Sequence, residues 1–234
     1  MWDNAPLLRN IANALTTFSV FAVLYGAGWY AVHLPGLFPL HSVRLDAAPQ
    51  RVQPEEVLQK VRGDVDGNFF TVDIDRLRQS LEQLPWVRGV GIRREFPDRL
   101  VVRLEEHSAL ARWNGNALVN TYGEVFDAQS EQMLPAFIGQ DGDSREISER
   151  YAALGEQLRP LGLGIAQIAL SPRHAWQLHL SNGMVLELGR EEMEQRLARF
   201  VEVYPYSLAA LEGSVRYVDL RYRNGFALGG AFNG

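Results

Sequence analysis

The pattern of apolar and polar positions divides the chain into an uncharged N-terminal run and a longer mixed remainder. Residues 11–32 contain no charged side chain. At about 1.5 Å per helical residue, this run reaches about 33 Å, enough to cross a hydrocarbon core about 30 Å thick. Aromatic residues, which favour membrane interfaces, lie near its end: Tyr25, Trp29 and Tyr30. We therefore predict a cytoplasmic tail at residues 1–10 and a transmembrane helix at residues 11–33.

Two other interpretations of the uncharged run remain open, a cleaved signal peptide and a buried core helix. A signal peptide has a shorter apolar core, about 7 to 15 residues, and a small-residue cleavage site; no convincing site precedes Pro35. The charge bias that orients a span is weak, because Arg9 and the terminal amine are opposed by Asp3. The absence of cysteine is compatible with an oxidising compartment. We expect the body, from about residue 34 onward, to be periplasmic.

Residues 41–106 alternate between strand and helix periodicity in the order strand, helix, helix, strand, strand. The predicted strands cover residues 41–45, 86–93 and 100–106, and the first helix covers residues 54–61. Asp73 or Asp75 is expected to cap the second helix. Its apolar face is Ile74, Leu77, Leu81 and Leu84. The predicted core of this domain is Val57, Leu58, Val61, Leu77, Leu81, Val87 and Val101.

Residues 107–234 predict a strand-rich domain with two helices, so the fold class is α+β. Asp143 and Glu146 have capping-box spacing before a helix that ends near Pro160. A second helix begins near Met193 and is expected to end at Pro205.

Two Asn-Gly pairs predict hairpins in this second region. Asn182-Gly183 joins residues 176–181 to residues 184–188, and Asn224-Gly225 joins residues 215–223 to a short final strand at 226–228. A short last strand is expected at a sheet edge, where backbone amides and carbonyls are available. Alternation in this hairpin places Val218, Leu220 and Tyr222 on one face and Tyr217, Asp219, Arg221 and Arg223 on the other.

Composition and motifs give no indication of catalysis. The formal net charge is -5, which argues against nucleic acid as a partner. The chain has no phosphate loop, metalloprotease helix or nucleophile elbow, and its five histidines have no ligand spacing. The pairs Glu105-Glu106 and Glu191-Glu192 fit a strand end and a helix start better than an acid/base couple. We therefore predict no enzyme activity, no catalytic residue, no metal site and no cofactor.

Short strings along the chain resemble those of a known family. The strings in the first region are Phe38-Pro39-Leu40, Gly67-Asn68-Phe69-Phe70, Leu84-Pro85-Trp86-Val87 and Phe96-Pro97-Asp98. Those in the second region include Ala111-Arg112-Trp113, Gly123-Glu124-Val125-Phe126, Trp176-Gln177-Leu178, Leu188-Gly189-Arg190 and Tyr217-Val218-Asp219-Leu220-Arg221-Tyr222. The first set resembles a POTRA domain. The ordered whole, after a single span, resembles the FtsQ/DivIB bacterial cell-division proteins, and most of all their Gram-negative FtsQ branch.

This resemblance implies a POTRA domain at residues 41–106 and a β domain with C-terminal edge strands at residues 107–234. It implies a non-catalytic divisome protein of the bacterial inner membrane, in contact with membrane lipid and located at the division septum. Its expected partners are the coiled-coil proteins FtsB and FtsL, bound by the C-terminal domain, and other divisome proteins at the POTRA domain and anchor. The partner-binding residues carried over from the family are Arg221, Tyr222, Gly229 and Arg173.

Several points stay open from the sequence. The match around Arg173 can shift by one residue to His174, and Gly230 stands where many relatives have a tryptophan. The last hairpin could also be a plain surface hairpin. The competing classes are another POTRA-bearing membrane protein that handles exported or outer-membrane polypeptides, and an anchored periplasmic enzyme. The first usually carries POTRA repeats or a β-barrel, and the second would need a catalytic constellation.

Overall fold

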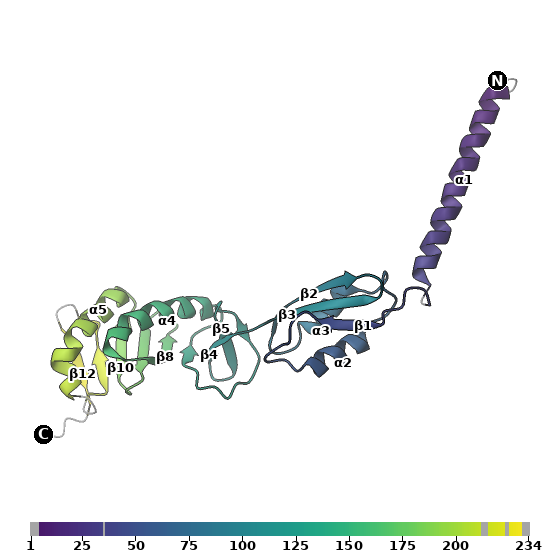
Figure 1. Cartoon of the computed structure of the whole chain (residues 1–234). Coiled ribbons are helices and arrows are strands. Elements are labelled where there is room, and N and C mark those ends of the chain that lie inside the picture. Colours follow the sequence, from purple (N-terminus) through teal and green to yellow (C-terminus); the bar gives the residue numbers. More distant parts are fainter. Residues whose placement is uncertain (1–4, 35, 212–214, 223–224, 231–234) are drawn as a thin grey trace. The chain divides into compact units, whose positions relative to one another are not determined.

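The computed structural model describes residues 5–34, 36–211, 215–222 and 225–230 of the 234. The chain divides into two compact units, residues 1–106 and residues 107–234. Each unit has its own sheet and its own hydrophobic core. In Figure 1 the first unit is purple to blue and the second is teal to yellow.

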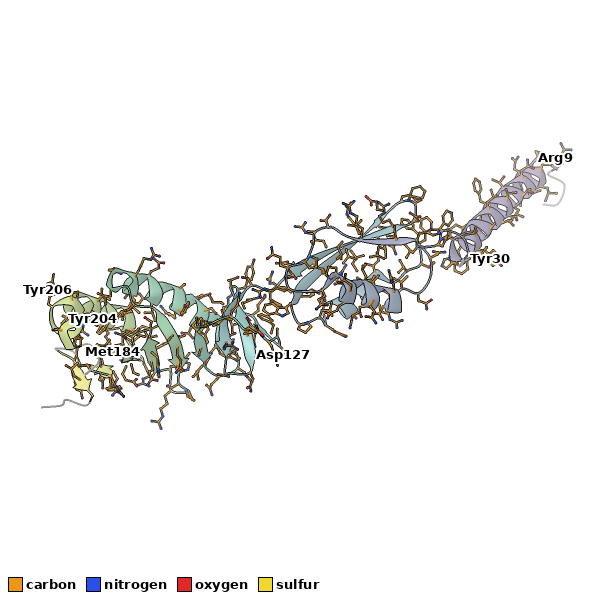
Figure 2. All side chains as sticks on the ribbon, turned by 60° about the horizontal axis from the view of Figure 1, so that its bottom comes forward. Arg9, Tyr30, Asp127, Met184, Tyr204 and Tyr206 are labelled. Atoms are coloured by element: carbon orange, nitrogen blue, oxygen red, sulfur yellow. The ribbon has the colours of Figure 1, made fainter. Side chains whose placement is uncertain are left out.

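The first unit begins with a long apolar helix, α1, at Ala5–His33. The helix is strongly apolar, and the rest of the protein buries none of its most apolar stretch. Arg9 and Tyr30 mark positions near its two ends in Figure 2. The helix is long and apolar enough to cross a membrane, and it begins six residues before the uncharged run.

The rest of the first unit follows the predicted order of strand, helix, helix, strand, strand. Its elements are β1 (Ser42–Leu45), α2 (Pro54–Asp64), α3 (Ile74–Leu81), β2 (Val87–Glu95) and β3 (Arg99–Glu106). Within the described residues these strands form one sheet in the order β1-β3-β2, with β1 parallel and β2 antiparallel to β3. Pro54 lies in the first turn of α2, and the Asp73 carboxylate accepts the Arg76 amide at 2.9 Å, which caps α3.

The core of this unit lies between the helices and one face of the sheet. Its fully buried members include Val57, Val61, Leu77, Leu81, Leu100 and Val102. Two residues of the predicted core do not lie in the observed core cluster. Leu58 is half-buried, and Val101 is buried outside this cluster, because alternation along β3 turns it away from its neighbours Leu100 and Val102.

The second unit consists of a large mixed sheet with helices along one side (Figure 1). Its strands are β4 (Ala109–Trp113), β5 (Ala117–Asn120), β6 (Val125–Phe126), β7 (Ala136–Ile138), β8 (Ile165–Leu170), β9 (Trp176–Leu180), β10 (Val185–Gly189), β11 (Tyr217–Asp219) and β12 (Ala227–Gly229). The long helices are α4 (Ser144–Leu158) and α5 (Met193–Val203). Among the described residues the strand order is β12-β11-β10-β9-β8-β7-β4-β5-β6. The predicted α+β class is confirmed.

The two faces of this sheet differ in chemistry. The face toward the helices is fully buried and apolar at Ile168, Leu178, Leu186 and Val218. The opposite face is half-buried and partly polar: the Gln177 amide donates to the Glu187 carboxylate, and the Gln177 carbonyl lies 3.0 Å from the ring nitrogen of His179. We call this second face the open face.

Two element ends differ from the sequence prediction. Asp143 does not cap α4, because its own backbone is helical and its carboxylate accepts the Gln140 amide instead. The second helix, α5, ends at Val203, two residues before Pro205, but a π turn at Tyr204–Leu208 continues the coil past the proline, with the Ala209 amide donating to the Tyr204 carbonyl. A proline cannot make the regular helical bond, and the wider turn accommodates that loss. In Figure 2 Tyr204 and Tyr206 mark this turn, where Tyr204 is buried and Tyr206 is 89% exposed.

Candidate functional site

The predicted site lies where the chain returns to the edge of the second sheet. β11 runs parallel to β10, and β12 runs antiparallel to β11 as the outermost strand at that edge. Tyr217 is opposite Gly229 and Asp219 is opposite Ala227. The predicted final hairpin is therefore present as a strand pair, although Asn224 of its turn lies outside the described residues.

Strand β11 ends earlier than the alternation predicted, and the cause is one local hydrogen bond. The Arg221 amide donates to the Asp219 carboxylate at 3.0 Å, a side-chain bond that competes with continued strand pairing. The strand stops at Asp219, so Arg221 and Tyr222 lie just beyond it. Leu220 still donates to the Glu187 carbonyl at 2.9 Å, and its side chain is fully buried.

The Arg221 guanidinium forms a two-pronged ion pair with Asp219. Its Nε lies 2.8 Å from Oδ1, and its Nη2 lies 2.6 Å from Oδ2. The Asp219 side chain is 7% exposed and that of Arg221 is 56% exposed, so the guanidinium covers the carboxylate and still faces solvent. The hydrogen bonds from Arg221 hold the pKa of Asp219 below its ordinary value, more than offsetting the opposite effect of burial. The same pair raises the pKa of Arg221.

Tyr222 is exposed, contrary to the alternation that grouped it with the buried residues Val218 and Leu220. Its exposed fraction is 58%, because the strand has already ended and the period of two no longer applies. Tyr217, on the open face, is half-buried. Burial first, and then the nearby carboxylates of Glu187 and Asp219, raise the pKa of the Tyr217 phenol. The neutral phenol of Tyr217 and the exposed ring of Tyr222 therefore belong to the same site as the ion pair.

Gly229 closely approaches the ring of its strand partner Tyr217. A Cβ built at this position would lie 3.3 Å from Cδ1 and 3.4 Å from Cβ of Tyr217. A larger residue would require the Tyr217 side chain to shift by a few tenths of an ångström. Gly229 thus acts in the pairing of β12 with β11, so its contribution to the site is structural in this geometry.

Arg173 lies in the turn between β8 and β9, where it is exposed. The turn is closed by the His174 amide, which donates to the Ser171 carbonyl at 2.8 Å, and His174 has a positive φ of 56°. Strand register places this turn at the same end of the sheet as Arg221, because Trp176 at the start of β9 pairs with Gly189 at the end of β10. The sheet therefore brings Arg173 to the same end as Arg221, with β9 and β10 between them.

Sequence reasoning missed two contributors, Asp219 as the ion-pair partner and Gly189. A Cβ at Gly189 would lie 3.1 Å from Cγ of Arg221 and 2.8 Å from Nη1 of Arg196, and its φ is +73°. The Arg196 guanidinium donates to the Leu188 carbonyl at 2.6 Å beside it. The spacing Asp-x-Arg at a strand end is the one sequence signal that could have indicated the pair.

Within the part of the chain that the structure describes, no group of three histidine, aspartate or glutamate side chains could hold a metal ion. The site instead offers a strand edge, an exposed ring and a partly exposed guanidinium. Exposed tyrosine and arginine side chains are common at protein-binding surfaces.

Comparison with known proteins agrees with this architecture. Residues 38–107 match the family model described as POTRA domain, FtsQ-type, and residues 111–221 match the one described as Cell division protein FtsQ/DivIB, C-terminal. The cell division protein FtsQ of Nitrosospira multiformis is 40% identical, over 98% of this chain and 99% of the relative. FtsQ of Burkholderia pseudomallei is 38% identical over 97% and 94%, and FtsQ of Escherichia coli is 32% identical over 94% and 84%.

The fold and the matched domains define the class: an FtsQ-type POTRA protein with an apolar N-terminal helix and a strand-rich C-terminal domain. The similarity extends over nearly the whole length of the relatives. The chain belongs to the FtsQ/DivIB family of bacterial cell division proteins. This membership gives it a role in the divisome.

Proposed function

We propose that this chain is a non-catalytic divisome scaffold that binds the FtsB/FtsL complex at the edge formed by β12, Arg221 and Tyr222. The observation that carries the proposal is the position of β12 as the outermost strand at its edge. Among the described residues, β12 pairs with β11 alone. A partner segment can therefore add a strand there, with backbone bonds giving affinity and side chains giving specificity.

Backbone hydrogen bonds on the inner side of β11 determine which way its groups point. The Arg216 carbonyl accepts the Val185 amide at 2.9 Å, and the Leu220 amide donates to the Glu187 carbonyl at 2.9 Å. The Arg216 carbonyl and the Leu220 amide, which flank β11, therefore bond toward β10, whereas the Arg216 amide donates to the Gly229 carbonyl of β12 at 3.1 Å. Because successive residues of a strand direct their backbone groups to alternate sides, the odd-numbered positions of β11 bond toward β12.

The same alternation identifies the group of β12 that faces a partner. Tyr217 and Asp219 bond toward β12, so their partners Gly229 and Ala227 point back toward β11. Leu228 lies between these two, and its amide and carbonyl point to the open edge. A partner strand would bond to Leu228, while the small side chains of Ala227 and Gly229 let it approach closely.

The side chains beside this edge supply the specificity of the proposed interface. Tyrosine and arginine are enriched at binding hot spots, because they combine large contact area with several hydrogen-bond groups. The Tyr222 ring is exposed, and the Arg221 guanidinium, fixed by Asp219, is more than half exposed. Arg173 at the same end of the sheet can contact a longer partner.

The experiment that tests the proposal replaces Leu228 with proline and, as a control, with alanine. Proline removes the outward amide without touching the bonds between β11 and β12, whereas alanine keeps the amide. In binding of the full-length chain, in nanodiscs, to the FtsB/FtsL complex, Leu228→Pro should lose about 1.4 kcal/mol, about tenfold in affinity. Leu228→Ala should lose clearly less. Equal affinities of the two variants, at matching melting temperatures, would exclude strand addition at Leu228.

We further propose that α1 crosses the inner membrane with residues 1–10 in the cytoplasm and the body in the periplasm, where α1 and the POTRA domain contact other divisome proteins. The length and apolar character of α1 support the span. A periplasm-active reporter fused after Gly234 should be active, and a cytoplasm-active reporter there should be silent. The reverse pattern would invert the proposed orientation.

A further inference from the structure

An aromatic cluster is formed by three loops of the first unit: the loop between α1 and β1, the loop between α2 and α3, and the turn between β2 and β3. We define it as Phe38, Phe69, Phe70 and Phe96. Their rings contact one another edge to face, with centroid distances of 5.1 Å for Phe38 and Phe70, 5.1 Å for Phe69 and Phe70, and 6.1 Å for Phe69 and Phe96. Three segments far apart in sequence therefore present one continuous aromatic surface.

This cluster is exposed to a degree that core packing does not explain. Phe38 is 42%, Phe70 is 44% and Phe96 is 73% exposed. Phe69 is buried, but it lies outside the main core cluster between the helices and the sheet. A contiguous exposed apolar surface marks an interaction site, because water is a poor solvent for it.

Hydrogen bonds fasten the cluster to the end of α1. Asn68 is fully buried, and its Nδ2 donates to the Val32 carbonyl at 2.6 Å and to the Leu34 carbonyl at 3.2 Å. The last carbonyls of a helix have no partner within it, so Asn68 satisfies groups that would otherwise stay open. The next residue along, Phe69, donates its amide to the Phe38 carbonyl at 2.9 Å.

The loop that carries Phe69 and Phe70 is held rigidly. The Asn68 Oδ1 accepts the Phe70 amide at 2.9 Å, and Arg94 donates from Nε to the Phe69 carbonyl at 2.8 Å and from Nη2 to the Val72 carbonyl at 2.9 Å. Phe38 has a positive φ of 61°, a strained conformation for a bulky residue. The fastened loop of Phe69 and Phe70 and the strained backbone at Phe38 together point to a function for the exposed rings.

We infer that this aromatic cluster inserts into the lipid interface at the His33 end of α1 and seats the POTRA domain on the bilayer. The inference rests on α1 crossing a membrane. Phe38 follows His33 by five residues, and an extended chain covers at most about 3.6 Å per residue, so Phe38 stays within about 18 Å of that end. Trp29 and Tyr30 mark the interface within α1, and aromatic rings favour that depth. Because the cluster is linked so closely to α1, the surface that its rings meet is lipid.

The test uses spin labels on single cysteines in the full-length chain in lipid nanodiscs, since the native sequence has no cysteine. One label replaces Phe96, which is exposed enough to be changed without unfolding the domain. A control label replaces Gln83, an exposed residue near the other end of β2, about 30 Å away by strand length. A second control replaces Phe21 in α1. Collision with oxygen, which dissolves in lipid, is compared with collision with a water-soluble nickel complex.

The inference predicts that the label at position 96 collides with oxygen and is protected from nickel, as at position 21, while the label at position 83 shows the reverse. Nickel access at position 96 equal to that at position 83, with position 21 protected, would overturn the inference and leave the span intact. Such a result would assign the cluster to a protein partner. Nickel access at position 21 would refute the span itself, and the inference with it.

Discussion

At the residue scale, the Asp219 and Arg221 pair decides the form of the proposed site. The sequence grouped both on one polar face and, by resemblance, assigned Arg221 to partner contact. The structure shows that Arg221 first covers a buried carboxylate and ends strand β11. Replacing Arg221 would therefore remove a proposed partner contact and expose the Asp219 carboxylate at the same time. Alternation predicted that the two share a face, but it could not predict a hydrogen bond that stops the strand.

Asp219→Asn should lower the stability of the second unit at neutral pH by about 1 to 2 kcal/mol, less than for a fully buried pair because the guanidinium faces water. The folded pKa of Asp219 is depressed, so its stabilising contribution is present above the unfolded pKa, near 3.8, and is lost as pH falls through the folded pKa. The difference in the free energy of unfolding between wild type and variant should thus shrink below about pH 4. Urea unfolding near pH 7 and near pH 3 measures it, and a constant difference would contradict the role of the ion pair.

At the element scale, helix faces were predictable, and element ends were predictable only in part. Leu77 and Leu81 are fully buried as the helical period predicted, and Asp73 caps α3. These features depend on residues three or four apart. Asp143 does not cap α4, because its carboxylate accepts the Gln140 amide, and Pro205 does not stop the coiled backbone, because a π turn follows α5.

Leu81→Ala should destabilise the first unit by about 2 to 5 kcal/mol, because it leaves a cavity in a fully buried position. Leu58→Ala is the matched control, since Leu58 is half-buried and borders a surface groove. Thermal unfolding of the chain from residue 34 onward compares them. A loss at Leu58 as large as at Leu81 would show that the assignment of the helix faces is wrong.

At the scale of the whole molecule, the order of elements was predictable and the assembly of the second sheet was not. The βααββ order follows from local periodicity. The pairing of β4 with β7 and of β10 with β11 is parallel and joins segments distant in sequence, which no local pattern specifies. The site residues came from resemblance to the family, and the geometry adds that Gly229 packs closely against the Tyr217 side chain. The link from Asn68 to the end of α1 had no sequence signal.

The most direct test of the central claim is the affinity of full-length Tyr222→Ala, in nanodiscs, for the FtsB/FtsL complex. Tyr122→Ala is the control, because Tyr122 is 60% exposed against 58% for Tyr222 and lies near the opposite edge of the same sheet. Both variants should keep the wild-type melting temperature. Tyr222→Ala should lose about 2 kcal/mol, or about 30-fold, while Tyr122→Ala binds as wild type. Unchanged binding by Tyr222→Ala, or a loss equal to that of the control, would contradict a partner-binding edge at β12.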